Sequence, residues 1–378
     1  MNIAVTSERS DEPRVAISPE TIKKLVNLGA AVKVQSGAGL RSRFSDQMLQ
    51  SQGAVIVDKA SSALEGSDIL LKVRRPSVDE VSTLKSEALV IGMLEPYGDL
   101  KGLEALAAKG VALFSMEFMP RITRAQSMDV LSSQANLAGY KAVIDGASVF
   151  GQAVPMMMTA AGTVPAAKIF IMGVGVAGLQ AIATGRRLGA IVSATDVRPA
   201  TKEQVQSLGA KFIAVEDAEF LEAQTSAGYA KPMSSAYQAK QLELTAQHLK
   251  TQDIVITTAL IPGRPAPRLI TRTMVENMKP GAVIVDLAAE QGGNCELTVP
   301  NQIVEVNGIK ISGPINLAGT VPVNASSLYA KNLLSFLETL FDKKEKLLKI
   351  DWNDEVVKGT LLAKAGKIVH PNLQQKKA

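Results

Sequence analysis

Short apolar runs alternate with amphipathic stretches along the first third of the chain. Stretches with helical spacing, such as residues 19–28 and 100–109, separate runs that have the length and the β-branched content of strands. Strands that are joined by helical crossovers form parallel sheets. This part of the chain therefore predicts one α/β domain. Its expected strands cover residues 3–5, 31–34, 54–57, 69–73, 89–93 and 111–114.

The same alternation returns later, between two long helical segments. Apolar residues at spacings of three and four predict helix within residues 116–154 and again over 325–341. Residues 356–359 and 367–371 then predict a small hairpin on the first domain. The strands expected between the helical segments cover residues 168–172, 191–195, 211–214, 254–257, 282–286 and 310–312.

These patterns predict an α/β fold with two Rossmann-like, doubly wound parallel-sheet domains that are linked by long helices. The first domain is expected to comprise residues 1–130 and to be completed by residues 325–378. The second is expected to comprise residues 131–324. A ligand is expected in the cleft between the domains.

One predicted strand, turn and helix start, residues 166–184, carries three closely spaced glycines. Gly173 permits a tight turn, Gly175 lets the backbone approach a pyrophosphate, and Gly178 lets the helix pack closely on the strand. Val176 and Ala177 lie at the helix start, where free N–H groups and the helix dipole favour phosphate. This order of elements predicts a dinucleotide site.

The next predicted strand, residues 191–195, ends in an acid. Asp196 stands 23 residues after Gly173. A carboxylate at this position accepts hydrogen bonds from both ribose hydroxyls and repels a 2'-phosphate, so the sequence predicts NAD(H) rather than NADP(H). Val197 and Arg198 follow the acid and are expected to border the cofactor. The positive charge of Arg198 leaves open some tolerance of a phosphate.

Polar side chains are crowded between the two predicted domains. Arg121, Gln126, Asp129 and Ser132 fall within twelve positions. They could hydrogen-bond a nicotinamide carboxamide and its ribose. The same residue types are equally typical of a solvated loop followed by a helix N-cap, so the spacing alone leaves both interpretations open.

Four segments together resemble the NAD(H)-binding component of proton-translocating NAD(P) transhydrogenase, and the resemblance covers nearly the whole chain. They are residues 121–140, 162–168, 257–267 and 278–294. The resemblance implies that Arg121, Gln126, Asp129 and Ser132 hold the nicotinamide and have the catalytic role. It also implies cofactor contacts from Thr258, Ala259 and Leu260, and a mobile flap around Tyr229 that closes over bound nucleotide.

The resemblance further implies an enzyme that is active only with partners. Hydride would pass directly from NADH to NADP+ held on a separate NADP(H)-binding component, and a membrane component would conduct protons. We therefore expect a homodimer in the cytoplasm, peripheral on the cytoplasmic face of the inner membrane.

Alanine dehydrogenase also resembles the chain. Arg14 and Lys72 match that family's substrate-binding arginine and lysine, but we interpret them as structural residues of a cluster at the strand ends. Its acid–base histidine is expected just after residues 89–93, where this chain has Leu94-Glu95-Pro96. Imine reduction needs a positioned proton donor, whereas hydride exchange between two nicotinamides needs alignment and exclusion of water. An amino-acid dehydrogenase and a non-catalytic NADH-sensing module are the alternatives.

Composition excludes several other classes. Of the 378 residues, 46% are hydrophobic and 20% charged, as in globular proteins, and no uncharged apolar run is long enough to span a membrane. A net charge of +5 and 4% aromatic residues give no nucleic-acid-binding pattern. The single cysteine, Cys295, excludes an intrachain disulfide. His248 and His370 lack partners for a metal site, and surface positions are expected for both.

Overall fold

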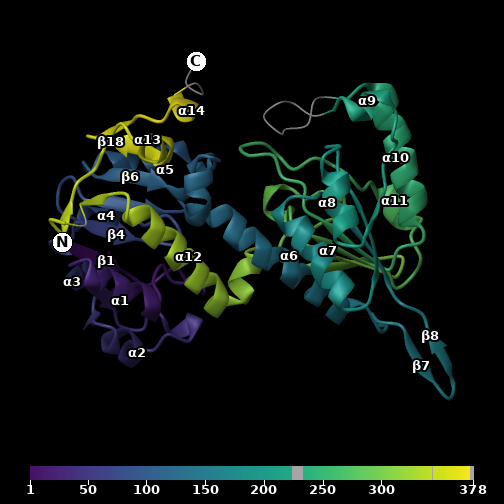
Figure 1. Ribbon diagram of the computed structural model, residues 1–378, viewed down its shortest axis with the longest axis horizontal. Helices are drawn as coiled ribbons and strands as arrows, with labels where there is room; N and C mark the ends of the chain where they lie inside the picture. The colour runs from purple at the N-terminus through teal and green to yellow at the C-terminus, as the bar shows by residue number, and fades with distance from the viewer. Residues whose placement is uncertain (224–232, 343, 375–378) are drawn as a thin grey trace. The chain divides into compact units, whose positions relative to one another are not determined.

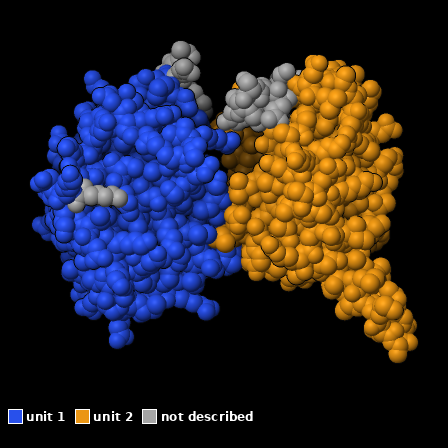
Figure 2. Space-filling model, in the orientation of Figure 1, with its two compact units in different colours: residues 1–134, 318–378 blue, residues 135–317 orange. Residues whose placement is uncertain are grey.

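The computed structural model describes residues 1–223, 233–342 and 344–374. It forms two compact units (Figures 1 and 2). Unit 1 comprises residues 1–134 and 318–378, and unit 2 comprises residues 135–317. The expected division into domains, 1–130 with 325–378 and 131–324, stays a prediction.

Unit 1 contains an eight-stranded sheet in the order β19-β18-β6-β5-β4-β1-β2-β3. The strands β1 to β6 pair in parallel, and β18 and β19 extend the sheet in antiparallel pairs. The bounds are β1 Asn2–Val5, β2 Ala31–Gln35, β3 Val55–Val57, β4 Ile69–Leu71, β5 Leu89–Gly92, β6 Ala112–Ser115, β18 Leu361–Lys364 and β19 Lys367–Ile368. A short hairpin, β16 Phe341–Asp342 with β17 Leu347–Leu348, lies outside this sheet.

Helices cover the central strands of unit 1, which are therefore buried and apolar on both faces. The helices are α1 Pro19–Asn27, α2 Asp46–Ser51, α3 Ala60–Leu64, α4 Val78–Ser82, α5 Leu100–Ala107, α12 Pro322–Leu337, α13 Glu355–Thr360 and α14 Pro371–Gln374. The α1 helix begins at Pro19 because the Ser18 hydroxyl accepts a hydrogen bond from Thr21 N. The long α12 helix contributes Tyr329, Leu333 and Phe336, all fully buried, to the core.

Unit 2 contains a seven-stranded sheet in the order β11-β10-β9-β12-β13-β15-β14, in which only β14 pairs antiparallel among the strands described. The chain runs outward from β9 to β11 and then resumes on the other side of β9 with β12. Ligands bind at such a switch point, beyond the carboxyl ends of the strands. The bounds are β9 Lys168–Met172, β10 Ile191–Thr195, β11 Lys211–Phe212, β12 Ile254–Thr257, β13 Val283–Asp286, β14 Ile303–Val306 and β15 Ile309–Ser312.

The helices of unit 2 are α7 Val176–Arg187, α8 Thr201–Ser207, α9 Ala218–Leu221, α10 Ser235–Leu249 and α11 Arg272–Glu276. The longest helix, α6 Val130–Val149, contains the boundary between the units. A hairpin formed by β7 Met157–Thr159 and β8 Gly162–Val164 extends away from the sheet of unit 2 (Figure 1). Met156, directly before β7, is 60% exposed, and Met158 within β7 is 79% exposed.

The predicted fold class is confirmed, since both units are α/β with mostly parallel sheets. Several details were predicted wrongly. Residues 356–359 lie in helix α13, and the C-terminal hairpin is built by β18 and β19 instead. The expected helical interval contains α6, but residues 116–118 and 123–128 form short 3-10 helices before it. Strands β7, β8, β14, β16 and β17 were not predicted, and α12 ends at Leu337 rather than at the expected residue 341.

Both histidines are packed rather than at the surface. His248 Nε2 lies 2.8 Å from Ser193 Oγ, and its ring meets Phe170 edge-on. His370 is 7% exposed and stacks on Phe118. Burial lowers the pKa of both imidazoles. Both therefore favour the neutral form at neutral pH and have structural contacts.

Candidate functional site

The glycine loop of unit 2 connects β9 to α7, and two of its glycines are required by the protein itself. Gly173 has a φ of +103°, in the region that favours glycine, and a Cβ there would lie 2.6 Å from Thr258 Oγ1. A Cβ on Gly178 would lie 1.9 Å from the carbonyl oxygen of Gly173. The close packing of helix on loop is therefore incompatible with any other residue at 178.

Gly175 is different, because nothing in the described protein fills the space beside it. A Cβ at this position would have no atom of the described residues within 4 Å, apart from those of Gly175 and its two chain neighbours. Gly175 is also the N-cap of α7 and gives the helix no side-chain cap, with a φ of −81° that any residue adopts. Uncapped N–H groups and open space at the N-terminus of a twelve-residue helix suit a pyrophosphate.

Helix α6 supports the start of α7. A Cβ on Gly139 would lie 2.0 Å from the carbonyl oxygen of Ala177, so the two helices approach closely at this point. Ala177 is partly exposed and Val176 is 38% exposed. Gly139 was not predicted as part of the site. Its signal in the sequence is a lone glycine inside a helical pattern, which marks close packing.

Asp196 follows β10 and lies against the glycine loop. Its Oδ2 accepts a hydrogen bond of 2.7 Å from Val174 N, and its side chain is 7% exposed. The guanidinium of Arg198 pairs with the same carboxylate through Nε at 2.8 Å and Nη2 at 2.9 Å. Val197, between them, is 49% exposed. The predicted acid and the predicted glycine loop are thus brought together.

The segment after β12 lies on the other side of the glycine loop. Thr258 Oγ1 donates to the carbonyl oxygen of Gly173 at 3.0 Å. Ala259 is held at both backbone atoms by one side chain: its N donates to Asn294 Oδ1 at 3.0 Å, and its O accepts from Asn294 Nδ2 at 2.8 Å. Leu260 is 49% exposed. Thr258 therefore contacts the loop directly, whereas Leu260 has a surface free to meet a ligand.

Asn294 is a positioning residue that the sequence did not assign. It is fully buried, and its segment is anchored by Asp286 at the end of β13. Asp286 accepts hydrogen bonds from Thr257 Oγ1, Ala288 N, Cys295 N and Thr298 Oγ1, at 2.6 to 3.0 Å.

The single cysteine, Cys295, has a structural role. It is fully buried, and burial raises the pKa of its thiol. The thiol is therefore unreactive and contributes to the packing of the core.

The four polar residues predicted to hold nicotinamide all lie in unit 1. Arg121, Gln126, Asp129 and Ser132 line one hollow of about 440 Å³, together with Pro120, Ile122, Thr123 and Ala125. Asp129 accepts hydrogen bonds from Ser132 N at 2.9 Å and Ser132 Oγ at 2.6 Å. This contact stabilises the first turn of α6, so Asp129 and Ser132 have a capping role whatever they bind. Arg121 and Gln126 are exposed. Tyr229, the centre of the predicted flap, lies outside the described residues.

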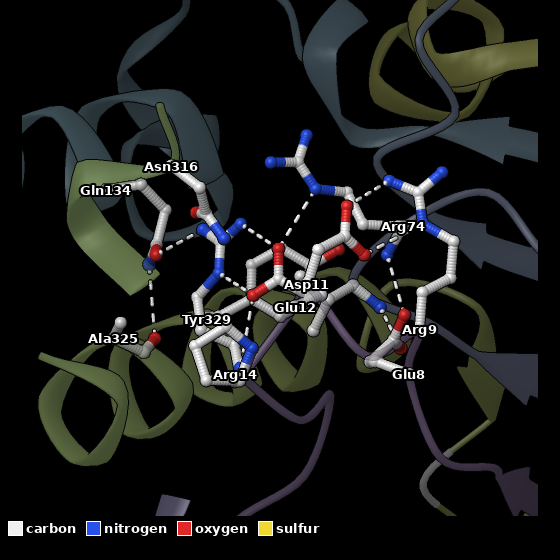
Figure 3. A network of polar contacts seen from close by, with 12 residues as sticks. Glu8, Arg9, Asp11, Glu12, Arg14, Arg74, Gln134, Asn316, Ala325 and Tyr329 are labelled. Carbon is white, nitrogen blue, oxygen red and sulfur yellow. Dashed lines mark hydrogen bonds and ion pairs between the residues drawn. The ribbon is translucent and has the colours of Figure 1, made fainter. Parts of the chain in front are cut away.

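A second polar constellation in unit 1 surrounds Arg14 (Figure 3). Arg14 is 3% exposed and pairs with Glu12 through Nε at 2.7 Å and Nη2 at 2.6 Å, while its Nη1 donates to Gln134 Oε1 at 2.8 Å. Glu12 also accepts from Arg74 Nε at 2.9 Å. Burial raises the pKa of Glu12, but the hydrogen bonds and charges of both arginines outweigh it and lower the pKa to about 2.

Lys72 is embedded in the same way. It is 3% exposed, and its Nζ lies 3.2 Å from Glu80 Oε1 and 3.7 Å from Glu8 Oε1. Burial raises the pKa of Glu8 despite Lys72, whereas Lys72 and several hydrogen bonds lower that of Glu80 against the effect of burial. Both cations that match the alanine dehydrogenase pattern are thus paired with acids within unit 1.

No three of the described His, Cys, Asp and Glu side chains are grouped so that they could hold a metal ion. Among the helices described, none combines the length and the apolar character needed to cross a membrane.

The sheet that reverses its strand order at β9, the glycine loop and the adjacent acid together define unit 2 as a domain of the dinucleotide-binding class. Residues 4–138 match the N-terminal domain of alanine dehydrogenase/PNT, and residues 142–371 match its C-terminal domain. An NAD(P) transhydrogenase subunit alpha chain of Rhodospirillum rubrum is 53% identical over 99% of both chains. The chain therefore belongs to the alanine dehydrogenase/PNT family and, within it, to the NAD(P) transhydrogenase alpha subunits.

Solved structures agree with this assignment. A crystal structure of transhydrogenase from Sinorhizobium meliloti superposes with a TM-score of 0.90 at 55% identity, covering 98% of this chain and 100% of that one. An L-alanine dehydrogenase superposes with a TM-score of 0.83 at 25% identity, covering 99% and 98%. The predicted resemblance to transhydrogenase, and the relation to alanine dehydrogenase, are confirmed.

Proposed function

We propose that this chain is the NAD(H)-binding component of a proton-translocating NAD(P) transhydrogenase. The observation that carries the proposal is the 2.7 Å hydrogen bond from Val174 N to Asp196 Oδ2, because it fixes an acid beside an open glycine loop. Membership of the transhydrogenase alpha subunits supports the same function.

The adenosine end of NAD(H) is assigned to unit 2. Asp196 receives the ribose hydroxyls, with Val197 and Arg198 beside it, and the N–H groups from Gly175 to Ala177 receive the pyrophosphate. The space beside Gly175 fits this group, since no described atom of the protein fills it. The surface segment 258–260 is assigned to the cofactor as well.

The nicotinamide end is assigned to Arg121, Gln126, Asp129 and Ser132. When bound, NADH supplies the hydride, and the chain's own residues orient the ring and exclude water. The acceptor is NADP+ on a separate component, because the described residues carry one glycine fingerprint and one nucleotide cannot assemble the reacting pair. Proton translocation is coupled through a membrane component on which this chain docks peripherally, at the cytoplasmic face of the inner membrane.

A homodimer also belongs to the proposal. The β7–β8 hairpin exposes Met157 and Met158, of which the second is 79% exposed, and Met156 directly before it is exposed as well. An isolated two-stranded hairpin is marginally stable in water, and exposed apolar side chains on it favour a partner surface. Light scattering should give twice the chain mass, and Met157→Ser with Met158→Ser should shift the equilibrium towards monomer.

Hydride transfer with and without the NADP(H)-binding component tests the function. In stopped-flow experiments, the purified chain with NADH and NADP+ should transfer no hydride until that component is added. Arg121→Ala and Asp129→Asn should slow single-turnover transfer in the complex and leave NADH affinity within a few-fold, because the adenosine and pyrophosphate contacts supply most of the binding.

Two outcomes would refute these assignments. Transfer without partner would reveal a second nucleotide site. Unchanged transfer in both variants would make the 121–132 segment purely structural. Ammonia-dependent reduction of pyruvate, measured in parallel, would support an amino-acid dehydrogenase instead.

A further inference from the structure

The carboxylate of Asp196 is fully engaged before any nucleotide binds. Its Oδ1 accepts hydrogen bonds from Arg198 N at 2.9 Å and Arg198 Nε at 2.8 Å. Its Oδ2 accepts from Val174 N at 2.7 Å and Arg198 Nη2 at 2.9 Å. A carboxylate has about four acceptor sites, and all of them are used here. Two ribose hydroxyls can therefore bind only if two present donors leave.

The donors that can leave are those of the Arg198 side chain. Val174 N belongs to the glycine loop between β9 and α7. The backbone of Arg198 is tied to α8, because its carbonyl oxygen accepts from Thr201 N at 3.1 Å and Thr201 Oγ1 at 2.7 Å. The guanidinium is 31% exposed, and its one other hydrogen bond to a described residue is a 3.2 Å contact from Nη2 to Val174 O. It can move into solvent without disturbing the backbone.

We propose that Arg198 is a specificity-determining residue that competes with the adenosine ribose for Asp196. In the free protein the guanidinium neutralises the acid and occupies the two acceptor sites that the ribose hydroxyls would use. A ribose diol displaces the guanidinium and takes over its two acceptor sites. The displaced cation stays beside the acid, where it weakens the repulsion between Asp196 and a 2'-phosphate. Arg198 thus lowers NADH affinity and softens the rejection of NADPH.

Titration of Arg198→Ala with NADH and NADPH tests this proposal, which rests on the proposed NAD(H) function. Without the guanidinium, two acceptor sites of Asp196 lack protein partners, and the ribose hydroxyls satisfy them. NADH should bind about tenfold more tightly, the order expected for one charge-assisted hydrogen bond. NADPH should bind more weakly, so the NADH to NADPH affinity ratio should rise by more than tenfold.

Lys202→Ala is the matched control, because Lys202 is another cation of the same segment that pairs with Glu216 rather than with Asp196. It should leave the affinity ratio unchanged. If Arg198 acts through Asp196, Arg198→Ala should have no effect on NADH affinity in an Asp196→Asn background. Arg198→Lys keeps the charge but loses the bidentate geometry, so it should tighten NADH binding with little loss of NADPH binding.

Each result decides the matter. Unchanged or weaker NADH binding by Arg198→Ala would overturn the competition and make Arg198 a direct cofactor ligand or a bystander. A tightening that persists with Asp196→Asn, or that Lys202→Ala reproduces, would reduce it to a general charge effect. Absence of NADH binding by the wild-type chain would instead overturn the proposed function itself.

Discussion

The two units contain the same local motif in two different environments. In each, an arginine pairs with an acid two positions before it through Nε and Nη2, and its backbone N donates to that acid as well. In unit 1 the pair is Glu12 and Arg14, with side chains 1% and 3% exposed. In unit 2 it is Asp196 and Arg198, with side chains 7% and 31% exposed.

The partners outside each motif explain what each pair does. Arg14 also donates to Gln134, and Glu12 also accepts from Arg74, so both side chains are held in place inside the unit. If either Glu12 or Arg14 were replaced, the charge of the other would remain buried without its main partner. Arg198 has one weaker additional contact, to Val174 O, and its guanidinium reaches solvent. Burial therefore makes the first pair structural and leaves the second free to exchange partners with a ligand.

Glu12→Ala should have the largest effect on folding. It leaves the buried Arg14 without its carboxylate and removes one of the partners of Arg74, and loss of one member of a buried ion pair costs about 3–5 kcal/mol. Urea unfolding followed by circular dichroism measures the loss. Arg9→Ala is the control, since the Arg9 and Asp11 side chains are both 62% exposed. Equal stability of the two variants would contradict the structural role of Glu12.

Acid should destabilise the wild-type protein through the same carboxylate. The pKa of Glu12 falls from an ordinary 4.5 to about 2, so its stabilisation is present above pH 4.5 and is lost as the pH falls towards 2. At about 1.4 kcal/mol per pKa unit, the loss is on the order of 3 kcal/mol.

The difference in unfolding free energy between wild type and Glu12→Gln, measured in steps from about pH 6 to pH 2.5, isolates this contribution. Burial raises the pKa of Glu117, which acts in the opposite direction but is common to both proteins. Burial also raises the pKa of Glu8, with a smaller contribution from the charge of Glu12 that the variant removes. The difference should shrink steadily below about pH 5. A constant difference over this range would show that Glu12 is not the acid-sensitive group.

Substitutions of two glycines in the glycine loop should separate effects on folding from effects on NADH binding. Gly178→Ala forces a methyl group to within 1.9 Å of Gly173 O, so it should destabilise unit 2 by about 1–3 kcal/mol, as overpacking does. The methyl group of Gly175→Ala meets no described residue beyond its chain neighbours within 4 Å, so stability should be unchanged, while the methyl group obstructs the pyrophosphate. Thermal unfolding and NADH titration test both variants. Normal NADH binding by Gly175→Ala would show that the pyrophosphate does not bind at this loop.

The two regions also differ in how far the sequence could predict them. The glycine loop and Asp196 were found because strand, turn, helix and acid follow in a fixed order whose spacing carries the geometry. The sequence predicted that Arg14 and Lys72 belong to a cluster at the strand ends, but it could not predict their partners. The contacts of Arg14 with Gln134 and of Glu12 with Arg74 span 120 and 62 positions, and only the folded chain brings these residues together.

Other errors have the same origin. His248 and His370 were expected at the surface because their local sequences are polar, yet tertiary packing places them against Phe170 and Phe118. Asn294 stands in a recognised segment, but its double contact with Ala259 spans 35 positions. The saturation of Asp196 by Arg198 is local, yet it depends on side-chain conformations that spacing does not determine.

Asp196→Asn should lower stability only slightly and completes the comparison between the two acid–arginine pairs. The amide keeps an oxygen for Val174 N and removes the charge that Arg198 pairs with. Only the acid of this pair is buried: the guanidinium is 31% exposed and can turn to solvent, so the unfolding free energy should fall by about 1 kcal/mol. Glu12→Gln, the matched change in unit 1, should cost several times more under the same conditions near pH 7. Urea unfolding of both variants, with NADH absent, gives the two values directly.

NADH affinity should respond in the reverse order, falling for Asp196→Asn and staying unchanged for Glu12→Gln. If Asp196→Asn were the more destabilising change, the Asp196 pair would be a structural element like that of Glu12, and the exchange of Arg198 for a ribose would lose its physical basis.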